Sequence, residues 1–342
     1  MIFDILSHIK ILAGCTSSVT SVLVPPVAKV GTPEQILLES PIAPPIVHLA
    51  RALGLKEIGV SVRDMRRMTT EIREGEYVQE PAKMAPIGNP IISIESLSLN
   101  FADKQVLKQV SANVFAHEIV AVMGRNGAGK SSLLKSLAGI MDGITGAVLV
   151  DSQDPQKLKS AVRRESIGFI PQEPSDLLYG QSVDIECAQA DSDNDVPKGT
   201  TVSVLNQLVP GISLHAHPRD LSEGQRLGLA LSVVLSGNPK ILILDEPTRG
   251  LDYQAKNELT RILIEFARAT GKCVLLATHD VELVAELASR VIFIADGEIV
   301  ADGTTLDVLL SSPAFAPQVS KVMSPQPWLK VSDVIAALDN PL

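Results

Sequence analysis

Short apolar runs alternate with amphipathic stretches through the centre of this 342-residue chain. Four runs are predominantly apolar, as expected of strands that a parallel sheet buries on both faces: EIVAVM (118–123), SIGFI (166–170), KILILD (240–245) and CVLLATH (273–279). Between the last two, NELTRILIEFARAT has a helical period that places four apolar residues on one face, namely Leu259, Ile262, Leu263 and Phe266. This alternation predicts an α/β fold built on a mostly parallel sheet.

Other patterns surround these strands. IISIESLSLNF (91–101) has strand character, and VIFIADGEIVADG (291–303) predicts a hairpin that turns at Asp296-Gly297. The stretch from Pro174 to Asp220 is more polar and partly helical, which indicates an inserted helical subdomain. Proline and glycine in EPAKMAPIGNP (80–90) discourage regular structure, so we interpret this segment as a linker.

The two ends of the chain contain an internal repeat. VGTPEQILLESPIAPPIV (30–47) aligns without gaps with DGTTLDVLLSSPAFAPQV (302–319), and SVRDM (61–65) resembles KVSDV (330–334). A repeat at this spacing indicates a duplicated domain, although chance similarity of two proline-rich tails is the alternative. We therefore divide the chain into a small helical remnant of an upstream domain plus linker (1–85), a main domain (86–310) and a helical tail (311–342).

Composition narrows the class of protein. The net charge of −9 argues against nonspecific binding to nucleic acid or to anionic lipid. Three widely spaced cysteines indicate neither a disulfide framework nor a zinc site, and a reducing cytoplasm fits them. Ile11 to Ala28 carries no charge, but its hydroxyl residues and Pro25-Pro26 disfavour a spanning helix. His215 and His217 lack a further ligand nearby, and we expect them at the surface.

A glycine-rich phosphate loop, GRNGAGKSS (124–132), follows the strand EIVAVM and precedes a helical pattern. Gly124, Gly127 and Gly129 allow the backbone N–H groups to approach a phosphate closely. Lys130 supplies a point charge to the β- and γ-phosphates, and Ser131 a hydroxyl ligand for Mg²⁺. Asn126 and Ser132 complete the predicted loop.

Polar residues follow three of the predicted parallel strands. Asp245 and Glu246 end ILILDEPT, where we expect Asp245 at the Mg²⁺ ion and Glu246 as the group that polarises the attacking water. Gln172 could reach metal and water, and His279 could hold the γ-phosphate or the water. Taken alone, each has an ordinary structural alternative: a helix cap or solvated turn, a loop amide, or a structural histidine. The phosphate loop favours the catalytic interpretation.

In chain order, the phosphate loop is followed by PQ, LSEGQ, LDEP, GLD and TH. This combination resembles the ATP-binding-cassette (ABC) family between about residues 91 and 310. The resemblance implies a P-loop NTPase cassette with an antiparallel β subdomain, and an ATPase with ATP and Mg²⁺ as its ligands. It also implies that Ser222, Gly224 and Gln225 grip ATP held by a second cassette. Phe101 would stack on adenine, and Asp252 would link the two sites across the pair.

More narrowly, PQEPSDLLYG, LSEGQR, DEPTRGLD and the proline-rich tail resemble the ATPases of energy-coupling-factor importers of vitamins or metal ions. In particular, they resemble the second half of a chain with two fused cassettes. This resemblance implies a second cassette, a transmembrane coupling subunit and a substrate-binding membrane subunit as partners, at the cytoplasmic face of the membrane. A soluble, non-transport ABC ATPase is the alternative. Glu223 and His117 depart from the family pattern, since glycine is more usual at both positions.

Overall fold

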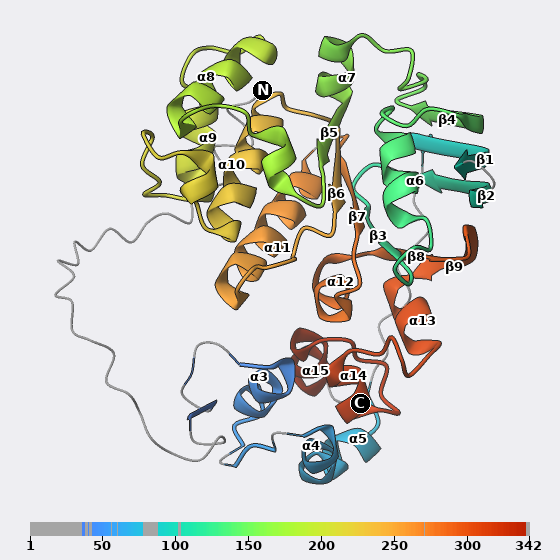
Figure 1. Cartoon of the computed structure of the whole chain (residues 1–342). Helices are drawn as coiled ribbons and strands as arrows, with labels where there is room; N and C mark the ends of the chain where they lie inside the picture. Colours follow the sequence, from blue (N-terminus) through green and yellow to red (C-terminus); the bar gives the residue numbers. More distant parts are fainter. Residues whose placement is uncertain are drawn as a thin grey trace, which may run out of the picture. The chain divides into compact units, whose positions relative to one another are not determined.

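The structure, a computed structural model, describes residues 36–37, 40, 43–55, 57–59, 61–77, 88–101, 104–269 and 271–339 (Figure 1). The chain divides into two compact units. The core unit is Ala85–Val308, and the tail unit combines Met1–Met84 with Leu309–Leu342. The tail unit thus brings together two segments that the sequence analysis treated separately.

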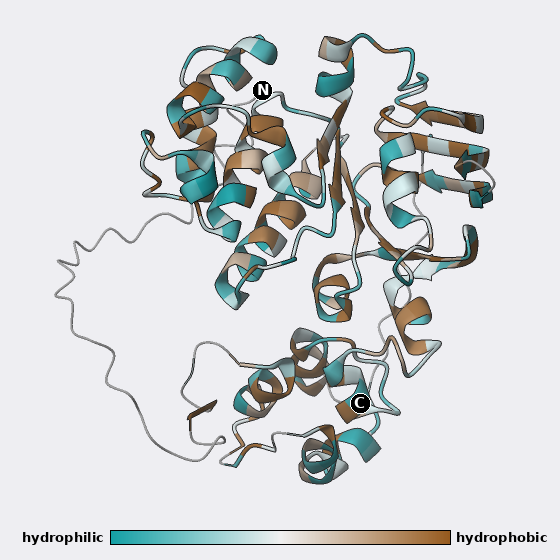
Figure 2. Ribbon diagram, in the orientation of Figure 1, coloured by the Kyte–Doolittle hydropathy of each residue, from teal (hydrophilic) through white to brown (hydrophobic). Residues whose placement is uncertain are grey.

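A six-stranded sheet forms the centre of the core unit. Its order is β5 (Ile167–Ile170), β6 (Ile241–Asp245), β7 (Cys273–Ala277), β3 (Ile119–Met123), β8 (Arg290–Ala295) and β9 (Glu298–Thr304). The first five strands are parallel and β9 is antiparallel to β8. Every residue of β3, β6 and β7 is buried, and these strands are hydrophobic (Figure 2) except for Asp245 at the end of β6. The predicted mostly parallel sheet is therefore confirmed, as is the hairpin, whose turn residues Asp296 and Gly297 have φ of 49° and 83°.

A second, three-stranded sheet is antiparallel, in the order β2 (Lys104–Val114), β1 (Ile92–Phe101) and β4 (Ile144–Val150). Alternate residues of β1, such as Ile92 and Ile94, are buried in the same hydrophobic core as β3 and β6. This sheet corresponds to the antiparallel β subdomain implied by the resemblance.

Helices complete the core unit. Those associated with the parallel strands are α6 (Lys130–Leu137), α7 (Ser160–Ser166), α11 (Tyr253–Arg268) and α12 (Val281–Leu287), with α13 (Thr305–Leu310) crossing the boundary between the units. The inserted subdomain contains η1 (Pro174–Leu177), α8 (Val183–Asp193), α9 (Thr200–Leu208) and η2 (Pro218–Asp220), and these pack with α10 (Glu223–Ser236) around a separate small core. The predicted apolar face of α11 is buried, as expected.

The tail unit consists of short helices around its own core: α3 (Pro45–Ala52), α4 (Val62–Met68), α5 (Thr70–Glu74), α14 (Gln318–Met323) and α15 (Val331–Asp339). Among the described residues, none of the helices combines the length and apolar character needed to cross a membrane. The uncharged stretch from Ile11 to Ala28 lies outside those residues.

Candidate functional site

The glycine-rich loop connects the buried end of β3 to the start of α6. Gly124 has a φ of 151°, and a Cβ there would lie 2.2 Å from the carbonyl oxygen of Ile294, so a side chain is excluded. Gly129 has a φ of 108° and precedes the first residue of α6 without a side-chain cap. The amide groups of this helix start are therefore available to an anion, since no side chain of the cap position accepts from them.

Lys130 is the first residue of α6 and only 6% exposed. Its ammonium group bends back over the loop and donates to the carbonyl oxygens of Gly124 at 3.0 Å and Arg125 at 3.3 Å. Its Nζ also lies 3.8 Å from Oε1 of Glu246. A buried ammonium at the mouth of a glycine-rich loop provides the point charge that a phosphate group requires.

Glu246 follows the last residue of β6 and is one of the non-glycine residues with positive φ, at 48°. Its amide donates to the carbonyl oxygen of Ala277, the last residue of the neighbouring strand β7, at 2.9 Å. Nδ1 of His279, two residues beyond that strand, lies 2.8 Å from Oε2 of Glu246. Parallel pairing of β6 with β7 thus brings together two side chains that are 33 residues apart in the sequence. Strained backbone at such a position is typical of functional sites.

Asp245, the residue before Glu246, is 2% exposed. Its Oδ1 is buried and has no hydrogen-bond partner in the part of the chain that the structure describes. An orphaned carboxylate oxygen is costly unless a ligand satisfies it, and carboxylate, hydroxyl and amide oxygens suit Mg²⁺. Asp245, Ser131 and Gln172 provide these three kinds of oxygen. The described residues include no group of three or more His, Cys, Asp or Glu able to hold a metal, so further ligands would have to come from substrate or water.

Lys130, Ser131, Gln172, Glu246 and His279 line one cavity of about 780 Å³, which we call the lysine cleft. Its walls include most of the predicted binding and catalytic residues: Phe101, Asn126, Gly127, Gly129, Lys130, Ser131, Ser132, Gln172, Glu246 and His279. Gly124 and Asp245 do not line it but adjoin residues that do. Phe101 is 52% exposed at the end of β1.

Three residues of the lysine cleft were missed by the sequence analysis, namely Lys104, Val106 and Arg249. Lys104 and Val106 belong to β2, which is paired with the strand that carries Phe101. Arg249 lies three residues after Glu246 and its Nη1 is 2.8 Å from Oε1 of Glu173, next to Gln172. The position of Arg249 directly after DEPT was a signal that could have identified it.

Ser222, Gly224 and Gln225 lie elsewhere. They line a second cavity of about 730 Å³, the LSEGQ groove, together with Asp252 and apolar residues of α10 and α11. Among the described residues, none lines both the LSEGQ groove and the lysine cleft. A third cavity of about 200 Å³ adjoins both, because its walls include Glu246 of the lysine cleft and Glu223 of the LSEGQ groove. Ser222 caps α10 through a reciprocal pair: its Oγ accepts from the Gln225 amide at 3.3 Å, and its amide donates to Gln225 Oε1 at 3.0 Å.

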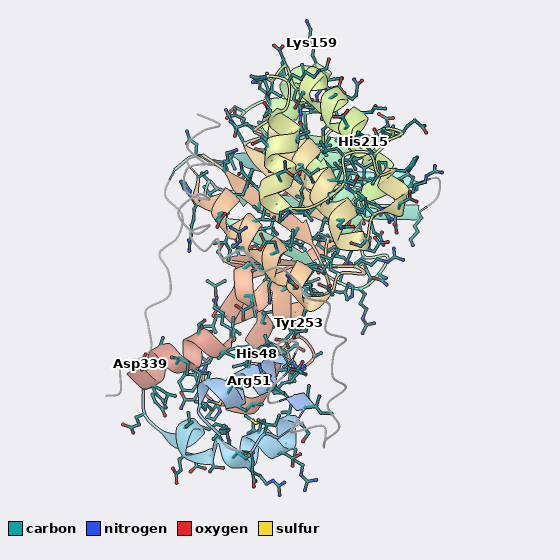
Figure 3. All side chains as sticks on the ribbon, turned by 90° about the vertical axis from the view of Figure 1, so that its left-hand side faces the viewer. His48, Arg51, Lys159, His215, Tyr253 and Asp339 are labelled. Atoms are coloured by element: carbon teal, nitrogen blue, oxygen red, sulfur yellow. The ribbon has the colours of Figure 1, made fainter. Side chains whose placement is uncertain are left out.

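The two departures from the family pattern have local explanations. The carboxylate of Glu223 is paired with Arg226 one turn along α10, at 2.9 Å, which offsets part of its negative charge. His117 has a φ of 68°, the backbone region that favours glycine. Its Nδ1 is 3.0 Å from the carbonyl oxygen of Ala267, and this contact helps to hold the turn. His215 is exposed in the helical subdomain, as predicted (Figure 3), whereas His217 is half-buried and its Nδ1 accepts from the Arg219 amide.

Comparison with known proteins identifies the architecture. A family model described as ABC transporter matches residues 107–249, which include the phosphate loop, LSEGQ and DEPT. The energy-coupling factor transporter ATP-binding protein EcfA of Methanothermobacter thermautotrophicus is 32% identical over 225 residues, which is 64% of this chain and 72% of that protein. The chain belongs to the ABC transporter ATP-binding proteins. A Streptomyces avermitilis protein named as an ABC transporter ATP-binding protein is 43% identical over 339 residues, or 90% of this chain.

Solved ABC structures agree with the fold of the core unit. The structure of cbiO1 from Clostridium perfringens, described as part of the ABC transporter complex cbiONQ, superimposes with a TM-score of 0.58 and 29% identity over 65% of this chain and 92% of that one. A dimeric ATP-binding cassette bound to ADP and Pi superimposes with a TM-score of 0.57 at 22% identity, over 63% of this chain and 98% of that one. This ABC chain spans 60% of the length of the Streptomyces avermitilis relative.

Proposed function

We propose that this ABC chain binds MgATP in the lysine cleft and hydrolyses it when a second cassette contributes an LSEGQ helix end. One observation carries the proposal: the two predicted phosphate-binding elements line different cavities, and no described residue belongs to both. The helix start at Ser222 suits an anion because the positive end of the helix dipole lies there, but Lys130, which would hold this chain's own ATP, lines another cavity. A partner's triphosphate is therefore the ligand that fits the LSEGQ groove.

We assign a role to each group in or beside the lysine cleft. Phe101 offers a ring for the adenine, and Lys130 with the loop amides holds the phosphates. Ser131, Gln172 and Asp245 would hold Mg²⁺, which when bound neutralises charge on the transferring phosphoryl group. Glu246 accepts a proton from, or orients, the attacking water, and His279 holds Glu246 in position through the 2.8 Å contact.

An importer is the setting that we propose for this ATPase, at the cytoplasmic face of a membrane. The likeness to EcfA and to cbiO1 supports an energy-coupling-factor type, in which a transmembrane coupling subunit and a substrate-binding membrane subunit complete the complex. Uptake of a vitamin or metal ion rests on the resemblance alone. The repeat at the two ends, and the greater length of the Streptomyces avermitilis relative, support a protein with two cassettes in one chain.

The decisive experiment separates the two cavities. Ser222→Arg should place a long side chain in the LSEGQ groove and so block the approach of the second cassette's ATP. ATP hydrolysis should then be lost while ATP binding in the lysine cleft persists. Ser182→Arg is the matched control, because Ser182 also caps a helix, accepting from the Ile185 amide at 3.3 Å. Loss of either cap costs about 1 kcal/mol of stability, so folding effects should be alike. If Ser222→Arg hydrolyses ATP at the wild-type rate, or if it loses ATP binding as a monomer, the proposal fails.

A further inference from the structure

Arg249 is a cation of the lysine cleft to which the proposed function gives no role. It lies three residues after Glu246, and its backbone amide donates to the carbonyl oxygen of Glu246 at 3.3 Å. Glu246 is in turn 3.8 Å from Nζ of Lys130. Arg249 therefore lines the cleft one tight turn away from the group that contacts the phosphate-binding lysine.

Arg249 also lines the third cavity, whose walls include its ion-pair partner Glu173. Glu173 lies three residues after the end of β5 and Arg249 four residues after the end of β6, and these two strands are parallel neighbours. Because the carboxyl ends of the strands are adjacent, the two side chains meet, with Nη1 of Arg249 2.8 Å from Oε1 of Glu173. Glu173 does not line the lysine cleft, so Arg249 joins the cavity of its partner to the cleft proposed for the nucleotide.

The ion pair holds Arg249 only weakly. The side chains of Arg249 and Glu173 are 61% and 55% exposed, and exposed ion pairs contribute little to stability because water screens them. A guanidinium group has five N–H donors. Among the contacts of the described residues, the side chain of Arg249 makes this one alone, so most of its donors are available to a ligand.

Arg226, at the start of α10, shows the opposite arrangement. Its side chain is 17% exposed and is paired with Glu223. It also donates to the carbonyl oxygens of Arg219 at 3.2 Å and Leu221 at 2.9 Å, which fixes the loop before the helix. A structural role therefore explains Arg226, whereas Arg249 has no comparable set of contacts in the part of the chain that the structure describes.

The backbone beside Arg249 is held in place. Gly250 has a φ of 74°, and a Cβ there would lie 3.2 Å from Cγ of Glu223, the first residue of α10. The chain next to Arg249 is thus packed against this helix. A change of partner by the guanidinium needs only rotation about the bonds of its exposed side chain, which is a fast motion.

A phosphate group is the ligand that such a cation fits. The planar fork of a guanidinium matches two phosphate oxygens, and these charge-assisted pairs are stronger than neutral hydrogen bonds. Glu246 would repel a phosphate in the cleft, and a second cation close to Glu246 would offset that repulsion. Because we place the attacking water at Glu246, the terminal phosphate of a triphosphate should lie there too. Arg249 should therefore contact a triphosphate but not a diphosphate.

We propose that Arg249 is a second phosphate-binding residue of the lysine cleft and that it selects the terminal phosphate of a nucleoside triphosphate. Glu173 holds the guanidinium in the nucleotide-free protein and releases it when the triphosphate binds. Because Glu173 follows Gln172, the exchange also frees the segment that carries a proposed Mg²⁺ ligand. The identity of the ligand rests on the proposed function.

Calorimetric titrations with a non-hydrolysable ATP analogue and with ADP, each with Mg²⁺, test this assignment. All proteins carry Ser222→Arg, which keeps a second cassette from contributing to binding. Arg249→Ala should weaken binding of the analogue about tenfold and leave that of ADP within about twofold. Arg249→Lys, which keeps the charge but not the fork, should give an intermediate loss. Arg67→Ala is the matched control and should change neither affinity, because Arg67 forms an exposed ion pair, 2.7 Å from Asp64, away from the lysine cleft.

Glu173→Gln tests the exchange of partners. It should strengthen binding of the analogue roughly threefold, because the carboxylate that competes for Arg249 is gone. In the Arg249→Ala protein the same change should have no effect, since Glu173 acts only through Arg249. If Glu173→Gln strengthens binding in both proteins, Glu173 repels phosphate directly and the exchange is wrong. No effect of Glu173→Gln in either protein would also overturn the exchange.

Equal loss of affinity for the analogue and for ADP in Arg249→Ala would overturn the selection of the terminal phosphate, as would unchanged binding of both. Failure of the proposed function gives a different result. In that case the protein with Ser222→Arg alone would bind neither nucleotide, or Lys130→Ala would bind both as tightly as the protein that retains Lys130.

Discussion

Replacing Glu246 with glutamine should have opposite effects on ATP binding and on ATP turnover. In the nucleotide-free protein the carboxylate attracts Lys130, with Nζ 3.8 Å from Oε1, and it faces the cleft in which the triphosphate would lie. At an effective dielectric constant near 20, a pair at this separation attracts by about 4 kcal/mol. An incoming phosphate has to compete with that attraction, and the carboxylate also repels the phosphate.

Only part of the Lys130–Glu246 attraction should be recovered as binding free energy for ATP, because the cleft opens to water and Lys130 keeps its two carbonyl partners. If about a third is recovered, roughly 1.4 kcal/mol, the Kd for ATP falls about tenfold in Glu246→Gln. Hydrolysis should fall by about 10²–10⁴, since the amide cannot act as a general base.

Calorimetric titration with a non-hydrolysable ATP analogue and Mg²⁺ measures the first effect, and phosphate release measures the second. Glu265→Gln is the matched control: it also removes an ion pair, 2.9 Å from Arg261 on α11, but away from the lysine cleft. The control should change neither quantity. Weaker binding by Glu246→Gln would refute the electrostatic reasoning, and undiminished turnover would refute the catalytic role.

Three further predictions concern the loop, the partner site and a buried lysine. Gly124→Ala should abolish ATP binding and lower the melting temperature, because its Cβ would lie 2.2 Å from a backbone oxygen; a stable variant that binds ATP normally would contradict this. If the chain pairs with itself, mixing inactive Lys130→Ala with inactive Ser222→Arg should restore about a quarter of the wild-type ATPase rate. Half of the dimers then contain one chain of each variant, and each such dimer has one intact site out of two. No recovery of activity in dimers that are shown to be mixed would refute shared sites. Burial lowers the pKa of Lys272 from 10.5 to about 8. Between pH 8 and pH 10.5 this lysine is therefore protonated in the unfolded chain but largely neutral in the folded one, so the free energy of unfolding rises with pH. Urea titrations at pH 7 and pH 9.5 measure this effect: the free energy of unfolding of the wild type should rise by about 2 kcal/mol more than that of Lys272→Met. The same pH dependence in both proteins would refute the lowered pKa.

The parallel sheet and the residues at its carboxyl edge could be predicted because apolar runs and phosphate-loop spacing are local signals. The Glu246–His279 contact follows from them only through the pairing of β6 with β7, which places two strand ends side by side. The Arg249–Glu173 pair could not be predicted in this way, since it joins two loops whose approach depends on the folded chain. Residue roles within the lysine cleft remain predictions.

The sequence patterns also could not predict that the two ends of the chain fold into one unit, although they revealed the repeat. Helices of the length of α3 and α14 have little stability of their own, so tertiary packing decides whether they form. Alignment showed that residues 30–47 and 302–319 are alike, but likeness does not specify contact. The buried pairs, such as Val47 with Val319, belong to one core only because each copy covers the apolar face of the other.

The separation of the lysine cleft from the LSEGQ groove poses a physical problem for the assembly of a complete site. A site divided between two cassettes is complete only while they are together, and association from solution costs translational and rotational entropy. A linkage that holds two cassettes near each other replaces that cost with an effective concentration, in the millimolar range for short linkers. In a protein that carries two cassettes in one chain, ATP turnover should therefore be independent of protein concentration, whereas turnover by this chain alone should depend on it. A rate per molecule that stays constant when this chain alone is diluted would refute the divided site.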